Sequence, residues 1–171
     1  MTDTNRPQVS TRDRDDVRRG LERWLVRRRA GATPSIVELT APQNTGMSSD
    51  TVLFTVDWND GDRVDTEQLV ARLAPDPDAA PLFPEYDLER QYLVMDAVGA
   101  HSVVPVPPRV GYEPDPSYVG TPFLVMERVD GVVPTDIPPY VFGAGWVAEA
   151  SDEDRERMQR DTFEPPIHRA A

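Results

Sequence analysis

The chain contains no cysteine and no lysine among its 171 residues, and it has only two histidines. Without cysteine it can form neither disulfide bonds nor thiolate metal sites, a composition typical of the expected cytoplasmic location. Without lysine, Schiff-base chemistry and the lysine of a Walker-type phosphate loop are excluded. His101 and His168 have no spacing typical of a zinc site, and no Gly-x-Ser-x-Gly elbow accompanies them.

The sequence also lacks a stretch of about 18 apolar residues, so no transmembrane helix is predicted. Met1–Ser10 is polar and has no apolar core of a secretory signal. The net charge of −12 opposes binding to nucleic acid, whose phosphates it would repel. The local cluster Arg27–Arg29 is interpreted as the solvated last turn of a helix. We therefore expect neither nucleic acid nor a membrane among the partners.

Hydrophobic periodicity predicts an N-terminal amphipathic helix and a sheet. The helix covers Asp13–Arg29, with Val17, Leu21, Trp24 and Leu25 on its apolar face. Strands are predicted at Ile36–Thr40, Thr51–Trp58, Thr66–Leu73, Arg109–Tyr112 and Pro122–Val129, and further helices at Tyr86–Val98 and Ser151–Arg160. About five strands with an interleaved helix predict an α+β fold, a mostly antiparallel sheet packed by helices.

The most specific motifs lie between Val103 and Gly131. A proline-rich segment leads into a strand, and then Gly120-Thr121-Pro122-Phe123 and Val125-Met126-Glu127 follow. In this order the motifs resemble the N-terminal lobe of the phosphotransferase family that includes aminoglycoside phosphotransferases and choline and homoserine kinases. The branch most similar to it is found fused to some acyl-CoA dehydrogenases and as stand-alone actinobacterial proteins. The resemblance covers about Val17–Arg160.

The resemblance implies a division of the chain and a cofactor. Residues 13–131 would form a protein-kinase-like N-terminal lobe that ends at a hinge, and residues 132–171 would begin the C-terminal lobe. Residues 1–12 are predicted to be disordered. ATP would be the cofactor, and its phosphoryl group would pass to a hydroxyl of a small molecule.

The resemblance also assigns roles to two charged residues. Arg72 stands where the family has the basic residue that binds the α- and β-phosphates, and a guanidinium can bind phosphate bidentately. The helix Tyr86–Val98 would supply the carboxylate that orients Arg72. Glu89 is the candidate for that carboxylate, and Glu85 is the alternative. A surface arginine and an exposed helix glutamate are the purely structural interpretations.

Two further segments would contact the nucleotide. Gly46, Ser48 and Ser49 lie in a loop that would cover the phosphates, where glycine allows close approach and serine donates hydrogen bonds. The strand after Pro122 would end in the hinge. There the Glu127 carbonyl and the Val129 amide would bond to adenine, and Met126 would wall the base pocket. The structural interpretations are an ordinary Gly/Ser loop and a buried strand.

The family's catalytic aspartate and Mg²⁺ ligands belong to a His-Gly/Asn-Asp segment and to a later Asp-containing segment, both after the hinge. Neither His101 nor His168 begins such a segment. We therefore expect a truncated ATP-binding lobe that is inactive alone, with Mg²⁺ held by residues that the chain lacks. A separately encoded C-terminal lobe, or self-association through apolar residues near the hinge, would cover its exposed side. The alternatives are a non-catalytic nucleotide- or protein-binding module and an acidic α+β domain of accidental similarity.

Overall fold

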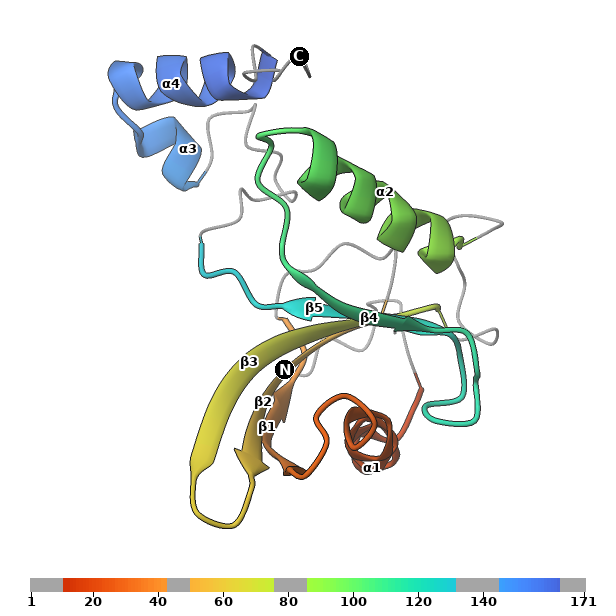
Figure 1. The fold of residues 1–171 in the computed structure, drawn as a ribbon. Coiled ribbons are helices and arrows are strands. Elements are labelled where there is room, and N and C mark those ends of the chain that lie inside the picture. Colours follow the sequence, from red (N-terminus) through yellow and green to blue (C-terminus); the bar gives the residue numbers. More distant parts are fainter. Residues whose placement is uncertain (1–10, 43–49, 76–85, 132–144, 164–171) are drawn as a thin grey trace, which may run out of the picture. The chain divides into compact units, whose positions relative to one another are not determined.

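The computed structural model describes residues 11–42, 50–75, 86–131 and 145–163 (Figure 1). The helices are α1 (Arg14–Leu25), α2 (Leu88–His101), α3 (Trp146–Glu149) and α4 (Asp152–Phe163). The strands are β1 (Thr33–Thr40), β2 (Asp50–Asn59), β3 (Val64–Leu73), β4 (Arg109–Glu113) and β5 (Phe123–Glu127). The chain divides into two compact units, the first of Met1–Leu93 with Pro107–Arg128 and the second of Val94–Val106 with Val129–Ala171. The sheet and α1 belong to the first unit, and α2 begins in the first and ends in the second.

The five strands form one antiparallel sheet in the order β1-β2-β3-β5-β4. This confirms the predicted α+β fold and leaves β1 and β4 as the two edge strands. The hairpin between β2 and β3 turns at Gly61, whose φ of +100° is one that L side chains rarely adopt. The Asn59 and Asp60 side chains accept hydrogen bonds from backbone amides of this turn, as Asn and Asp do in turns generally.

Helix α1 confirms the predicted N-terminal amphipathic helix. Asp13 caps it, because one side-chain oxygen accepts from the Asp15 and Asp16 amides at 2.7 and 3.2 Å. The helix ends at Leu25 rather than Arg29, since the Arg27 and Arg28 amides bond to carbonyls only three residues back, those of Trp24 and Leu25, in a tighter turn. Arg27–Arg29 therefore lie in the turn after the helix.

The main core lies between α1 and one face of the sheet (Figure 1). The buried residues of this core are Val17, Leu21, Trp24, Leu25, Ile36, Val52, Phe54, Val56, Trp58, Leu69, Ala71, Leu73, Val119, Phe123 and Val125. The four apolar residues predicted for α1 are all among them. The rings of Trp24 and Phe123 meet edge to face at 5.3 Å, which joins the helix to β5, the strand between β3 and the edge strand β4.

Several boundaries differ from the predicted ones because of local bonding. Strand β1 begins at Thr33, three residues early, since Thr33 to Ser35 pair with β2. Helix α2 begins at Leu88, because the Asp87 side chain accepts from the Arg90 amide at 2.8 Å and caps the first turn. In the second unit, α3 was not predicted. Ser151 caps α4, as its Oγ accepts from the Asp154 amide at 3.1 Å.

Asp50, the first residue of β2, is a buried carboxylate with a side-chain exposure of 3%. Arg14 Nη2 lies 3.2 Å from one of its oxygens, and Arg12 Nη1 lies 3.6 Å from the other. The ion pairs join the start of α1 to the start of β2. Among the described helices, none is long and apolar enough to cross a membrane.

Replacing Asp50 by asparagine is expected to lower the free energy of unfolding by about 2 kcal/mol. The change leaves two guanidinium groups facing each other without the carboxylate between them. The loss should fall below that of a fully buried pair, because the Arg14 side chain is 40% exposed and solvent screens it. Urea denaturation measures the effect. Asp62→Asn, in the exposed β2–β3 turn, is the matched control and should change stability by less than about 0.5 kcal/mol. Equal losses in both variants would contradict the role of Asp50.

Candidate functional site

The strand register places Arg72 in a row of side chains on the sheet face opposite α1. Thr51, Arg72, Leu124 and Tyr112 face one another across β2, β3, β5 and β4. Directly opposed residues of antiparallel strands point to the same side of a sheet. Ala71, the neighbour of Arg72, belongs to the core under α1. The row therefore occupies the other face.

Arg72 is a half-buried cation on this face. Burial lowers the pKa of its guanidinium below the ordinary value for arginine. The group nevertheless stays protonated at neutral pH, because arginine loses its proton only far above that range. Since charges interact more strongly where water is partly excluded, the position suits the binding of an anion such as a phosphate.

An apolar strip lies beside Arg72 on the same face. Leu53, Val70 and Met126 face one another across β2, β3 and β5, one row along from Arg72. Val70 is buried, and the side chains of Leu53 and Met126 are partly exposed. A partly covered apolar surface next to a cation has the composition of a small-molecule site. The structure thus brings Met126 and Arg72, two of the predicted site residues, onto one surface.

A β-bulge in β4 shapes the far end of this face. The register shifts between Arg109 and Gly111, with Val110 as the extra residue. Val110 packs against the core under α1, so Arg109 and Tyr112 can both face the other way. The Arg109 guanidinium stacks over the Tyr92 ring at 5.1 Å, and the Tyr92 and Tyr112 rings lie 6.2 Å apart. These contacts hold the first turns of α2 against β4 on the face that carries Arg72.

Glu89 lies in the first turn of α2 and is exposed. Burial raises the pKa of the Tyr112 phenol, and the negative charges of Glu89, Asp87 and Glu113 raise it further. Tyr92, three residues further along α2, lies against the Tyr112 ring, and Tyr112 shares a row with Arg72. The first turn of α2, which carries Glu89, therefore lies on the same side of the sheet as Arg72. A direct contact between Glu89 and Arg72 stays a prediction.

Gln91 is a residue that the sequence reasoning missed. Its Oε1 atom is buried and has no hydrogen-bond partner within the described part of the chain. Such an acceptor is costly to leave unbonded, so it is ready to receive a donor. Gln91 lies three positions after Leu88, the buried residue of α2, and residues with this spacing share one side of a helix. The spacing could therefore have predicted that the Gln91 side chain is on the buried side of α2. Gln91 thus joins Glu89 as a candidate for orienting Arg72.

The other predicted site residues are placed as follows. Gly46, Ser48, Ser49 and Glu85 lie outside the described residues. Glu127 ends β5, and its amide donates to the Pro108 carbonyl at 2.8 Å. Val129 is 66% exposed and belongs to the second unit, where it is the first residue of the segment Val129–Ala171. The predicted hinge bonds to adenine stay a prediction.

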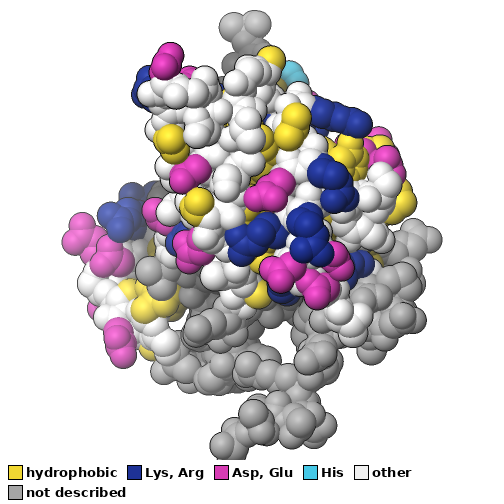
Figure 2. Space-filling view, turned by 90° about the horizontal axis from the view of Figure 1, so that it is seen from below, with side chains coloured by type: hydrophobic (Ala, Val, Ile, Leu, Met, Phe, Trp, Pro, Cys, Tyr) yellow, Lys and Arg dark blue, Asp and Glu magenta, His cyan; other side chains and the backbone are white. Residues whose placement is uncertain are grey.

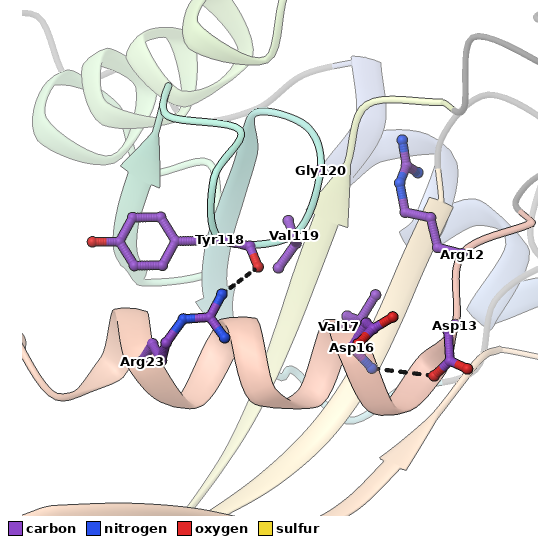
Figure 3. Close-up of a pocket in the computed structure, with 8 residues that line it drawn as sticks. All are labelled: Arg12, Asp13, Asp16, Val17, Arg23, Tyr118, Val119 and Gly120. Atoms are coloured by element: carbon purple, nitrogen blue, oxygen red, sulfur yellow. Dashed lines mark hydrogen bonds between the residues drawn. The ribbon is translucent and has the colours of Figure 1, made fainter.

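The opposite face of the sheet has a groove of about 380 Å³ between α1 and the loop from β4 to β5 (Figure 3). Arg12 and Arg23 stand toward its two ends, and Val17 and Val119 lie between them (Figure 3). Arg23 donates to the Tyr118 carbonyl at 3.1 Å and so holds the helix to the loop. The acidic residues of the rim are the N-cap Asp13 and Asp16 of the first turn, and the groove lies on the face away from Arg72.

The arginines after α1 are likewise bonded within the molecule. Arg29 donates to Asp65 at 2.8 Å and stacks over Trp58 at 5.5 Å, and this hydrogen bond lowers the pKa of the Asp65 carboxyl. Arg27 stacks over Tyr118 at 5.4 Å. Viewed from the side on which α1 lies in Figure 1, basic and acidic side chains alternate over this surface (Figure 2). The cluster Arg27–Arg29 is thus partly paired and stacked rather than simply solvated.

No known protein-family model matches the sequence. Within the described ranges, no three carboxylate or imidazole groups lie close enough together to hold a metal ion.

Proposed function

We propose that the chain is the nucleotide-binding lobe of a small-molecule phosphotransferase and that it binds ATP on the sheet face of Arg72. The supporting observation is the juxtaposition of a half-buried guanidinium and an apolar strip on one face. The strip of Leu53, Val70 and Met126 suits a flat aromatic base, and Arg72 suits the triphosphate. The two parts of one ligand would thus meet two neighbouring parts of one surface.

The start of α2 completes this proposed site. A guanidinium that binds phosphate works best when a second group fixes its direction. Among the described residues, Glu89 and Gln91 are the candidates, one exposed and charged, the other with a buried oxygen that has no hydrogen-bond partner there. In the proposed complex, the base lies over Val70 and Met126, and the phosphates extend toward Arg72.

The proposed reaction is the transfer of the γ-phosphoryl group of ATP to a hydroxyl of a small molecule. Such a transfer needs a base for the hydroxyl proton and Mg²⁺ to neutralise the charge that develops on the phosphoryl oxygens. The His-Gly/Asn-Asp segment that would supply the base is absent from the sequence. We therefore propose that this chain by itself binds ATP without transferring the phosphoryl group.

Replacing Arg72 by alanine should weaken ATP binding about tenfold to a hundredfold, as a lost charge-assisted hydrogen bond predicts. Isothermal titration of the full chain with ATP and Mg²⁺ measures the dissociation constant. Binding of adenosine should change little, since it lacks the phosphates that Arg72 would contact. Arg63→Ala is the matched control, because it removes an exposed arginine at the far end of the β2–β3 hairpin.

Two results would contradict the proposed function. The first is a wild-type chain that does not bind ATP at millimolar concentration. The second is ATP binding of equal strength in the wild type and in the folded Arg72→Ala variant. A loss of equal size in Arg63→Ala would indicate general electrostatic attraction instead of a site at Arg72.

A further inference from the structure

Both edge strands of the sheet carry a β-bulge, and α1 or the turn after it bonds to the backbone at each one. In β1 the register shifts between Ile36 and Glu38, and Val37 is the extra residue. In β4 the extra residue is Val110. An edge strand has unpaired amides and carbonyls that can accept a strand from another molecule, and bulges and charged side chains are two devices that prevent this. In this sheet, a bulge and a charged side chain occur together at each of the two edges.

At β1, two residues of α1 occupy both backbone polar groups of Ile36. The Ile36 amide donates to Glu22 Oε1 at 2.8 Å, and the Ile36 carbonyl accepts a hydrogen bond from Arg18 Nη1. Arg18 and Glu22 stand four residues apart on α1, so they extend from the same side of the helix. They bond to β1 much as a neighbouring strand would, with one acceptor and one donor.

At β4, Arg28 has a similar role. Its Nη1 donates to the Val110 carbonyl at 3.3 Å, and its guanidinium stacks over the Trp24 ring at 4.2 Å. Gly111 leaves the space for it, since a Cβ atom there would lie 2.5 Å from Arg28 Nη2. Arginine side chains from one helix and its following turn thus reach backbone groups at both edges of the sheet.

We propose that Arg18 and Glu22 block the edge of β1 and thereby prevent it from pairing with β1 of a second copy of this chain. Strand β1 is the edge more suited to such pairing. It has eight residues, Glu38 is its one charged residue, and the side chain of Val37 is 56% exposed. Two antiparallel copies of one strand are self-complementary under two-fold symmetry, so the same segment supplies both halves of the interface. Strand β4 is shorter and carries charges at both ends.

The competing force is the net charge of −12, which repels two copies at long range. At 0.1 M salt, charges that lie more than about 10 Å apart are largely screened, so the repulsion between two approaching copies is weak until they come close. The hydrogen bonds that occupy the Ile36 amide and carbonyl oppose strand pairing independently of this long-range repulsion.

The test compares the full-length wild type with the double variant Arg18→Ala/Glu22→Ala by sedimentation equilibrium at several concentrations in 0.15 M salt. The double variant should dimerise at a concentration at least tenfold lower than the wild type. Arg19→Ala is the matched control, since Arg19 is an exposed arginine of α1 that pairs only with Asp16 in the described structure. Adding Val37→Lys to the double variant should reverse the dimerisation, because a charge on the edge opposes strand pairing.

A folded double variant that sediments like the wild type would overturn the proposal. So would dimerisation that persists after Val37→Lys, because the strands would then not meet at β1. If the double variant does not fold, the hydrogen-exchange rate of the Ile36 amide is measured in the single variant Glu22→Ala instead. The Ile36 amide should exchange at least tenfold faster than in the wild type, and an unchanged rate would show that Glu22 does not protect this edge.

Discussion

Replacing Gly20 by alanine should lower the free energy of unfolding by about 3 kcal/mol, although alanine favours helices over glycine by about 1 kcal/mol. An added Cβ would lie 2.0 Å from the Tyr118 carbonyl oxygen and 2.8 Å from its carbon. These are backbone atoms, which cannot turn aside as the end of a long side chain can. The helix would have to move away from the loop, and the packing of α1 on the sheet would loosen. The steric clash therefore outweighs the gain in helix propensity, and the substitution is destabilising.

The matched control is Gly99→Ala in α2. A Cβ at Gly99 would meet the end of the Val106 side chain at 3.1 Å, a contact that a small rotation can relieve. This variant should be neutral or more stable by up to about 1 kcal/mol, as helix propensity predicts. Urea denaturation followed by circular dichroism gives both values. A Gly20→Ala protein as stable as the wild type would show that α1 does not approach Tyr118 as closely as described.

Replacing Trp24 by alanine is expected to cost about 4 kcal/mol of stability. The side chain is 1% exposed and packs edge to face on Phe123. Its Nε1–H group donates to Glu113 Oε2 at 3.1 Å, so the change also removes this donor and leaves the carboxylate with the Asp115 amide on its other oxygen. Arg28 would lose the ring over which it stacks. The substitution thus removes core volume, a hydrogen bond and a support of the β4 edge together.

Trp24→Phe separates these contributions. Phenylalanine keeps most of the packing but cannot donate to Glu113, so the expected loss is about 1–2 kcal/mol. Chemical denaturation of both variants under the same conditions measures the difference. If the two substitutions destabilised the protein equally, the hydrogen bond to Glu113 rather than the packing on Phe123 would account for the effect of Trp24.

The arrangement of Arg72 and its surroundings was only partly predictable. Alternation along the strand indicates that Arg72 and Ala71 point to opposite faces, because strand side chains alternate. It does not indicate which residues of distant strands lie beside Arg72. That depends on the register of β3 with β5 and on the bulge in β4, and the bulge in turn depends on how Val110 packs on the core.

Gln91 and Glu89 illustrate the same limit on α2. The sequence favours Glu89, since a carboxylate is the expected partner of a guanidinium. The structure adds that Glu89 is exposed and that the buried polar atom of α2 belongs to Gln91. Which side of a weakly amphipathic helix faces the sheet is determined by tertiary contacts, here those of Tyr92 with Arg109 and Tyr112.

By itself the sequence determined most of the elements, since apolar periodicity, capping residues and turn residues act over a few neighbouring positions. It was enough to predict α1 with its buried face, the five strands and the antiparallel sheet. Tertiary structure alone decided that Arg18, Glu22 and Arg28 bond to edge backbone, that Asp50 is buried between two arginines, and that Arg72 shares a face with Val70 and Met126. These contacts join residues far apart in the chain, and their distances follow from how the helix and the strands pack.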